Sequence, residues 1–380
     1  MYNRLVKFQK ALKKQNLDGF IVTNPVNIFY LTGFKGISPA EREGILVFSP
    51  KATLITAKLY QAEALKLRSP KLKIKIADER NKILDAISKV LKGKTKVGLS
   101  ADLSTKDLSS VEALAKVGFE EQDLKYLEFK EFKKTVKNTK LVPCKNLVED
   151  LRIIKSPEEI KSIEKAQLIS QKAFQYLLKT IKIGSTEAEI ADKLSKIIKD
   201  LGGQGLAFES IIAAGTNSAL PHYKTGNRKI KNGQVLLFDF GAKYQNYCAD
   251  FSRTVFVGKV NTQKHKVFQL VQKAQKKTID SISQGIKTAD VYQAAYKVFK
   301  DSKVNQYFLH GLGHGVGLEI HEAPRLKPNN NAKLLENMVF SVEPGLYFPA
   351  WGGVRIEDLV VIKNGRAKVL GKLQEGIIVI

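Results

Sequence analysis

Two aspartates inside apolar segments are the first residues of this 380-residue chain with an unusual chemical setting. Asp239 lies in Val235–Gly241 and Asp250 in Tyr247–Val257, two runs that are rich in β-forming residues and joined by a turn. A carboxylate is costly to bury in an apolar strand unless a partner compensates its charge. In a hairpin, two such acids about 4 Å apart would repel each other by about 4 kcal/mol at an effective dielectric constant near 20. The pair therefore predicts a cation between the two strands.

Three further candidate ligands follow, and each lies in apolar or glycine-rich sequence. His314 is flanked by glycines, which allow close approach of the backbone. Glu343 ends an apolar strand just before a proline, and Glu357 lies in another apolar strand. Singly, each acid has an ordinary alternative as an edge or capping residue, and only their joint occurrence favours a metal site. One imidazole and four carboxylates suit two divalent ions, Mn²⁺ in the first place and Co²⁺ or Zn²⁺ as alternatives.

Four of the five histidines lie in this part of the chain in glycine-, proline- or loop-rich contexts. Besides His314 these are His222, His310 and His321, whereas His265 belongs to a lysine-rich amphipathic segment and is expected to be exposed. His222 follows a proline in a loop-like segment that could lie over the metal site. The unusual contexts of these histidines support the candidate metal site.

These motifs resemble the catalytic domain of the pita-bread metallopeptidases, the family of methionine aminopeptidase, aminopeptidase P and prolidase. The resemblance covers residues 150–380, and the N-terminal pattern is similar to the creatinase-type domain of the proline-specific members. It implies an α+β fold with pseudo-twofold halves. It also implies that Asp239 binds one metal, that His314 and Glu343 bind the other, and that the two remaining acids bridge both.

The same resemblance implies the roles of the other residues. Glu343 would be the general base for attack by a metal-bridging hydroxide on the carbonyl before a substrate proline. His321 and His310 would stabilise the oxyanion or protonate the leaving nitrogen. The groups expected to bind substrate are His222, Arg355 and Tyr347.

Two features place the chain in the proline-specific branch of that family. The last glutamate stands in the sequence RIED, and an α/β domain precedes the catalytic domain. The expected activity is that of an Xaa-Pro aminopeptidase on peptides with proline at the second position, with an Xaa-Pro dipeptidase (prolidase) as the alternative. A non-catalytic binding protein on the same fold is the remote alternative, and the family resemblance implies a homodimer.

The elements expected to position these residues form two domains with a linker. Residues 1–130 alternate helical and strand patterns, which is typical of an α/β domain. Residues 131–150 are expected to be a linker interrupted by Pro143, and residues 151–380 form the catalytic domain. Within the first domain, Asn24-Pro25-Val26-Asn27 is interpreted as a turn, and later elements include a strand at Lys96–Leu99 and a helix from Thr105.

Capping signals mark the helices of the second domain. Ser156-Pro157-Glu158-Glu159 predicts a capped helix start, and Thr186-Glu187-Ala188-Glu189 predicts a second one. Gly184–Ala188 resembles Gly285–Ala289, and each precedes a helix. The echo suggests that the domain consists of two similar α/β halves.

The net charge of +26 and the cysteine content limit other interpretations. The lysines are dispersed and no nucleic-acid motif accompanies them, so they are interpreted as solvated helix faces rather than a nucleic-acid surface.

No run is apolar enough to span a bilayer and no signal peptide is recognised. With only Cys144 and Cys248, a cytoplasmic protein without a disulfide scaffold is expected. Cys248 is expected to pack beside Asp250 as a small apolar residue.

Overall fold

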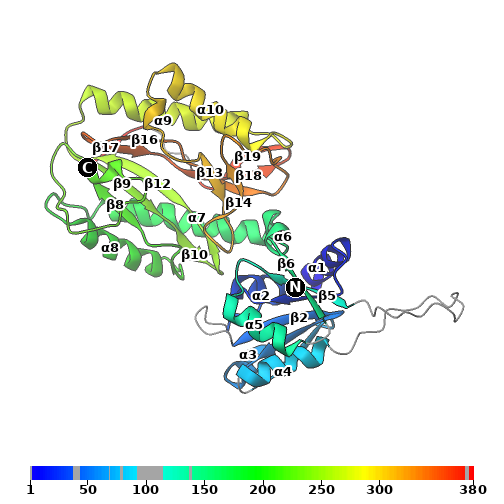
Figure 1. The fold of residues 1–380 in the computed structure, drawn as a ribbon. Coiled ribbons are helices and arrows are strands. Elements are labelled where there is room, and N and C mark those ends of the chain that lie inside the picture. The colour runs from blue at the N-terminus through cyan, green and yellow to red at the C-terminus, as the bar shows by residue number, and fades with distance from the viewer. Residues whose placement is uncertain are drawn as a thin grey trace, which may run out of the picture. The chain divides into compact units, whose positions relative to one another are not determined.

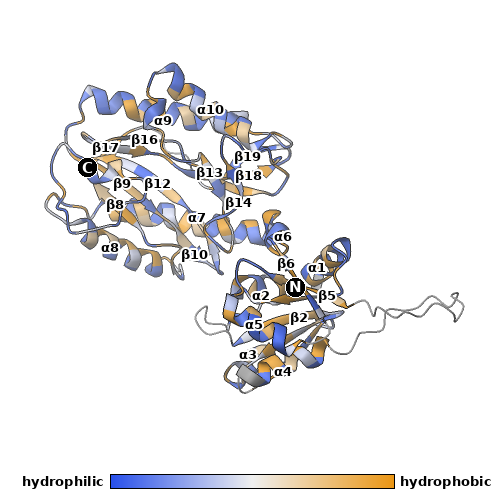
Figure 2. Ribbon diagram, viewed as in Figure 1, coloured by the Kyte–Doolittle hydropathy of each residue, from blue (hydrophilic) through white to orange (hydrophobic). Residues whose placement is uncertain are grey.

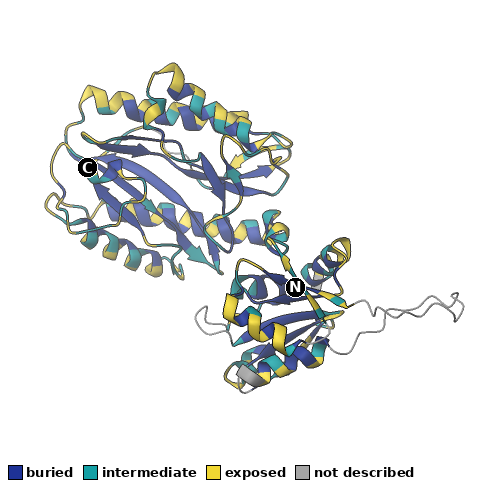
Figure 3. Ribbon diagram, in the orientation of Figure 1, coloured by how far each residue is buried: buried dark blue, intermediate teal, exposed yellow. Residues whose placement is uncertain are grey.

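The computed structural model describes residues 2–36, 43–67, 69–77, 80–91, 114–136, 139–372 and 376–380. The chain divides into two compact units, Met1–Leu151 and Arg152–Ile380 (Figure 1). In both, the strands are mostly buried and the helices expose hydrophilic outer faces (Figures 2 and 3). No helix among the described residues is long and apolar enough to cross a membrane.

The N-terminal unit is built on one six-stranded sheet in the order β4-β3-β2-β1-β5-β6. Its first three strands pair antiparallel in sequence, and the outer pairs β3–β4 and β5–β6 are parallel, as is β1–β5. The strands are β1 (Gly19–Val22), β2 (Gly44–Ser49), β3 (Lys51–Thr56), β4 (Leu72–Ile76), β5 (Ala115–Glu120) and β6 (Thr139–Cys144). The predicted α/β pattern is therefore present in the described part of this unit.

The helices of this region include two that pack on the sheet through a common apolar core. These two are α4 and α5, and their core contacts include Ile87 and Phe132. The helices are α1 (Tyr2–Lys14), α2 (Pro25–Thr32), α3 (Gln61–Ala64), α4 (Arg80–Leu91), α5 (Tyr126–Thr135) and α6 (Glu149–Ile153), with the 3₁₀ turn η1 (Lys58–Tyr60). The predicted strand Lys96–Leu99 and the helix from Thr105 lie outside the described residues.

Two expectations for this unit are corrected. Asn24-Pro25 does not make a free turn: the Asn24 side chain accepts hydrogen bonds from Val26 N and Asn27 N and caps α2, whose first residue is the proline. Residues 131–150 are not a plain linker, because they contain the end of α5 and strand β6. β6 is an edge strand, where Pro143 is tolerated.

The first half of the C-terminal unit packs two helices against a four-stranded sheet in the order β20-β12-β9-β8. Ser156 and Glu159 form the predicted capping box at the start of α7, with Ser156 N donating to Glu159 Oε2 at 2.7 Å. The elements are α7 (Pro157–Leu178), α8 (Glu187–Asp200), β7 (Gly205–Leu206), β8 (Ile211–Ala214), η3 (Gly215–Ala219), β9 (Val235–Phe240), β10 (Ala242–Tyr244), β11 (Tyr247–Cys248), β12 (Phe251–Phe256) and β20 (Ile378–Val379).

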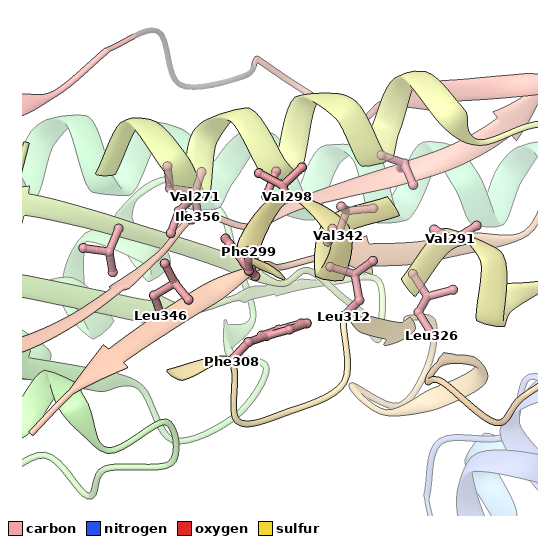
Figure 4. Packing of buried hydrophobic residues seen from close by; sticks show 14 of the residues in the cluster. Val271, Val291, Val298, Phe299, Phe308, Leu312, Leu326, Val342, Leu346 and Ile356 are labelled. Carbon is pink, nitrogen blue, oxygen red and sulfur yellow. The ribbon is translucent and has the colours of Figure 1, made fainter. Parts of the chain in front are cut away.

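The second half repeats this plan with a five-stranded sheet in the order β14-β13-β15-β18-β19. Apolar side chains from α9 and α10, among them Val271 and Phe299, pack against the strand residue Val342 and against Ile356, which directly follows a strand (Figure 4). The elements are α9 (Thr262–Ser281), α10 (Thr288–Asp301), η4 (Asn305–Tyr307), β13 (Gly313–Gly315), β14 (Glu322–Leu326), β15 (Val339–Val342), β16 (Gly345–Phe348), β17 (Gly352–Arg355), β18 (Asp358–Lys363) and β19 (Arg366–Val369).

The backbone hydrogen bonds support the internal repeat. Gly184 N donates to Ile230 O at 2.9 Å before α8, and Gly285 N donates to Leu334 O at 2.7 Å before α10. Both glycines have positive φ, +93° and +89°, a conformation that favours glycine. The sequence echo therefore corresponds to two equivalent helix starts, each paired with a returning segment.

Candidate metal centre

Four of the five predicted ligands lie at or near the ends of strands or in short breaks between them, and the fifth, His314, lies in a strand of three residues. Asp239 is the second-last residue of β9, His314 is the central residue of β13, and Glu343 directly follows β15. Asp250 and Glu357 were expected inside strands, and this is corrected. Asp250 lies in a two-residue break between β11 and β12, and Glu357 lies in a two-residue break between β17 and β18.

Glycines make room for the strand that carries the imidazole. A Cβ atom on Gly313 would lie 2.0 Å from the carbonyl oxygen of Ser341, and one on Gly315 would lie 2.0 Å from that of Ala323. Any larger residue would push these strands apart. The flanking glycines of His314 therefore permit the close strand packing that the sequence indicated.

Three of the five side chains form a compact donor group. Asp250, His314 and Glu357 each offer a ligand atom, these atoms all lie within 4.8 Å of one another, and all three residues are buried. His314 Nε2 is 3.4 Å from Asp250 Oδ2 and also 3.4 Å from Glu343 Oε1. The spacing leaves room for a cation among the donors.

The imidazole presents a lone pair to this group. His314 Nδ1 is 3.2 Å from the carbonyl oxygen of Gly315, which can only accept a hydrogen bond, so Nδ1 carries the proton. Burial lowers the pKa of His314 to about 3, so Nε2 is unprotonated at neutral pH. A lone pair that faces two carboxylates is unfavourable unless a cation lies between them. The donor set thus fits a divalent metal.

Unpaired oxygens support the same fit. Within the described part of the chain, Asp239 Oδ1 and Glu357 Oε1 are buried without a hydrogen-bond partner. Buried polar atoms in native proteins normally have partners, and a bound metal would provide one. The other oxygen of each acid is occupied: Arg355 Nη2 donates to Asp239 Oδ2 at 2.6 Å, and Ser252 Oγ donates to Glu357 Oε2 at 2.6 Å.

Three acids of the site, Asp250, Glu343 and Glu357, have raised pKa values when only protein surrounds them. Burial, followed by the charge of Glu357, raises the pKa of Asp250 well above its ordinary range. Burial and then the charge of Glu343 do the same to the pKa of Glu357. Burial raises the pKa of Glu343 to about 7. Burying these carboxylates together in their charged form is therefore unfavourable, and a bound cation would offset that cost.

A chain of hydrogen bonds links Asp239 to a partly buried histidine, His310. Arg355 Nη1 donates to Tyr347 Oη at 2.7 Å, and Tyr347 Oη is 2.7 Å from His310 Nε2. His310 Nδ1 must donate to Gly311 O at 2.7 Å, so Nε2 accepts the tyrosine proton. Burial lowers the pKa of His310 to about 3. Both ring nitrogens are thus engaged, and the histidine is neutral.

Three residues beside the acids were missed by the sequence analysis. These are Ser252, Arg253 and Asp358, and all three are buried. Ser252 Oγ donates to Glu357, and Arg253 Nη2 donates to Asp358 Oδ1 at 2.7 Å. Arg253 Nη1 also donates to the carbonyl oxygen of Glu357 at 2.5 Å. The only sequence signal was their position beside the ligands, in DFSR and RIED.

A cavity of about 460 Å³ joins the ligands to the predicted substrate groups. It brings together all five predicted ligands with His222, His310, His321 and Arg355. Its lining is Phe208, Ile211, Pro221, His222, Asp239, Asp250, His310, Gly311, Gly313, His314, Ile320, His321, Arg325, Lys327, Glu343, Arg355 and Glu357. Arg325 and Lys327 were not predicted. Their place follows from β14, in which Arg325 lies opposite His314.

Two predicted residues lie behind the cavity and do not line it. Tyr347 is absent from the lining among the described residues, and only 1% of its surface is exposed. Cys248 ends β11 and is likewise buried away from the lining, with Sγ 3.6 Å from the carbonyl oxygen of Leu318. The strand break after Cys248 removes the alternation that would have placed it beside Asp250.

Comparisons with known proteins agree with this architecture over the whole chain. Residues 161–364 match the metallopeptidase family M24, and residues 4–154 match the creatinase/prolidase N-terminal domain. The Xaa-Pro dipeptidase of Pyrococcus furiosus is 36% identical over 375 residues, which are 98% of this chain and 99% of that protein.

Two solved structures are similar over their full lengths. The Xaa-Pro dipeptidase from Bacillus anthracis has a TM-score of 0.90 at 29% identity and covers 100% of this chain and 99% of its own. The X-Pro aminopeptidase from Thermotoga maritima has a TM-score of 0.84 at 28% identity. The match covers 98% of this chain and 100% of the aminopeptidase. The predicted fold, a creatinase-type α/β domain followed by a pita-bread domain, is confirmed. The chain belongs to the metallopeptidase family M24 and is a metallo-exopeptidase.

Proposed function

We propose that this enzyme is an Xaa-Pro dipeptidase that splits a dipeptide into an amino acid and free proline. The order of the two activities expected from the sequence is thereby reversed. The support is that the relative from Pyrococcus furiosus and the similar structure from Bacillus anthracis are both named Xaa-Pro dipeptidases.

The observation that carries the proposal is the basic side of the cavity. Arg325 and Lys327 line the same space as the acidic donor group, and Arg325 lies opposite His314 in the β13–β14 ladder. In a dipeptide, the free carboxylate is only one residue from the scissile bond, so a cation near the donor group can bind it. A longer peptide has no charge at that distance.

We propose that the five predicted ligands, Asp239, Asp250, His314, Glu343 and Glu357, hold two divalent ions, with Mn²⁺ as the working choice. When bound, these ions supply Lewis-acid activation of water and of the scissile carbonyl group. We also retain the expected homodimer as a proposal for solution measurement.

The residues of the chain then divide the remaining work. Water adds to the carbonyl carbon, the C–N bond to proline breaks, and the proline nitrogen gains a proton. Glu343, fixed by a hydrogen bond from Ser341 Oγ at 3.1 Å, is proposed to take the proton from the water. His321 and His222 line the cavity and are proposed to contact the oxyanion or the carboxylate of proline.

The hydrogen-bonded residues Arg355, Tyr347 and His310 receive other roles here than the sequence suggested. His310 has no free N–H, and Tyr347 is screened from the cavity, so neither is assigned direct contact with the reacting atoms. Arg355 is occupied by Asp239 and Tyr347. We propose that these three residues orient Asp239 instead of binding the substrate.

The test is a comparison of three substrates with chelator-treated protein reloaded with Mn²⁺. We expect an Xaa-Pro dipeptide to be cleaved, whereas its C-terminal amide and an Xaa-Pro-Xaa tripeptide should be cleaved at least tenfold more slowly. Equal or faster cleavage of the tripeptide would refute the dipeptidase and favour the X-Pro aminopeptidase, the activity named for the similar Thermotoga maritima structure.

An internal check uses the proposed cation. Arg325→Gln should raise KM for the dipeptide with free carboxylate but leave KM for the amide nearly unchanged. An equal effect on both substrates would contradict carboxylate binding by Arg325.

A further inference from the structure

Glu187, which the sequence marked only as part of a helix start, is a fully buried carboxylate with four hydrogen bonds. Oε1 accepts from Ala214 N at 2.7 Å and from Asn217 Nδ2 at 2.9 Å. Oε2 accepts from Tyr223 Oη at 2.8 Å and from Gly226 N at 3.3 Å. All four donors belong to one segment, residues 214–226.

This segment carries His222 to the cavity. After η3 it contains no helix or strand through residue 226, and the backbone contact around His222 is a turn hydrogen bond from Tyr223 N to Leu220 O at 3.2 Å. His222 is exposed and directly precedes Tyr223, whose hydroxyl binds Glu187. Ser218 Oγ also accepts from Gly353 N at 2.8 Å, which secures the start of the segment. Arg355 Nη1 donates to Pro221 O at 3.4 Å, and Thr225 Oγ1 donates to Ser210 O at 2.8 Å. Glu187, with four hydrogen bonds to the segment, is therefore a buried anchor of the part that contains His222.

The internal repeat shows that a helix start of this kind does not need a carboxylate. The position equivalent to Glu187 in the second half is Thr288, which is also fully buried. Thr288 Oγ1 donates a single hydrogen bond, to Asn330 O at 2.6 Å. Both halves make the same backbone contacts there, from Glu187 N to Arg228 O and from Thr288 N to Ala332 O. The acid at position 187 thus adds contacts that only the half with His222 possesses.

We propose that Glu187 is a positioning residue that holds the segment 214–226 so that His222 lies correctly for substrate binding. The proposal rests on the proposed function only for what His222 binds. The anchoring itself is a property of the fold and can be measured without substrate.

Glu187→Gln is the main variant, because it keeps the size of the side chain and replaces one acceptor by an amide donor. Whichever way the amide is oriented, it faces a backbone N–H of Ala214 or Gly226, so at least one hydrogen bond is lost. Glu189→Gln is the matched control. Glu189 is exposed and lies two residues further in α8, and its side chain accepts a hydrogen bond from Thr186 N at 2.9 Å.

The first measurement is amide hydrogen exchange by mass spectrometry on the full chain. We expect exchange within residues 214–226 to become at least tenfold faster in Glu187→Gln, whereas Glu189→Gln should affect only the first turn of α8. Tyr223→Phe removes one of the four hydrogen bonds and should give a smaller change in the same segment, which keeps the test usable if Glu187→Gln folds poorly. Unchanged exchange in both variants would refute the anchor.

The second measurement is dipeptidase kinetics in a double-mutant cycle. We expect Glu187→Gln to lower kcat/KM about tenfold, in the same parameter, KM or kcat, that His222→Ala changes, and to have no further effect in the His222→Ala background. Additive losses would overturn positioning through His222. If the wild-type enzyme cleaves no Xaa-Pro dipeptide, the proposed function fails, and the exchange data still decide whether Glu187 anchors the segment.

Discussion

Asp250→Asn should have opposite effects on thermal stability without and with metal. In the metal-free protein, Asp250 is buried beside Glu357 and close to Glu343, and the three acids disfavour one another's charge. An asparagine of the same shape removes one charge and offers an N–H donor to its neighbours. In the metal-loaded protein the same change removes a ligand.

The expected magnitudes follow from the distances. Two charges up to 4.8 Å apart, as for the ligand oxygens of Asp250 and Glu357, repel by about 3.5 kcal/mol at an effective dielectric constant of 20. Partial protonation of the acids reduces this repulsion, so the free energy of unfolding of the metal-free variant should exceed that of the wild type by about 1–3 kcal/mol. Metal at 100 times its Kd stabilises the wild-type protein by about 2.7 kcal/mol. In a unit of this size that is a rise in Tm of about 5–11 °C.

Calorimetry of both proteins, after chelation and with added Mn²⁺, gives the four values of Tm. We expect the variant to melt higher than the wild type without metal and to gain less than half of the wild-type increase with metal. Asp192→Asn, at an exposed position of α8, is the control and should show the wild-type increase. If Mn²⁺ leaves the Tm of the wild type unchanged and elemental analysis finds only trace metal, the donor group does not bind a cation.

Three further outcomes are expected. Tyr347→Phe should lower kcat/KM about 10–100-fold with little change in Mn²⁺ affinity, measured by steady-state kinetics and metal titration, because it breaks the hydrogen-bond chain without removing a ligand. Asp358→Asn should lower the free energy of unfolding in urea by about 3–5 kcal/mol, because Arg253 keeps its buried charge without a counter-ion. Burial raises the pKa of Glu120 from 4.5 to about 7, so the folded state retains a proton that the unfolded state releases. The free energy of unfolding should therefore fall by about 3 kcal/mol between pH 4.5 and 7, and Glu120→Gln should remove this slope in urea titrations.

The candidate ligands could be picked out from the sequence because an acid inside an apolar run is visible there. Asp239 and Glu343 stand in or at the end of apolar runs, where an acid is costly to bury, and their joint occurrence with the other candidates favoured a metal site. The glycines around His314 gave a second signal, since the strands that pack against them leave no space for a Cβ atom. Both signals depend only on the residue and its immediate neighbours.

The features that the sequence analysis predicted wrongly or missed depend instead on contacts between residues distant in sequence. Asn24-Pro25 suits a turn and a helix start equally well, and only the hydrogen bonds of the folded unit select the helix. Glu187 could not be distinguished from an ordinary first-turn acid, since its partners lie some 27 to 39 positions away. The basic residues Arg325 and Lys327 gave no signal in a chain with a net charge of +26.

The strand breaks at Asp250 and Glu357 explain how acids from separate strands can meet at one point. In a regular strand, side chains stand perpendicular to the sheet, which fixes the direction in which a carboxylate points. A two-residue interruption frees the backbone to turn the carboxylate, and Ser252 then secures the result: its hydroxyl donates to Glu357 Oε2 and its carbonyl oxygen accepts from Glu357 N at 3.1 Å. Ser252 is also the register partner of Asp239 in the β9–β12 ladder. Ser252 thus connects the two sheets at the donor group, so a change at Ser252 should disturb the alignment of the candidate ligands more than the stability of either half.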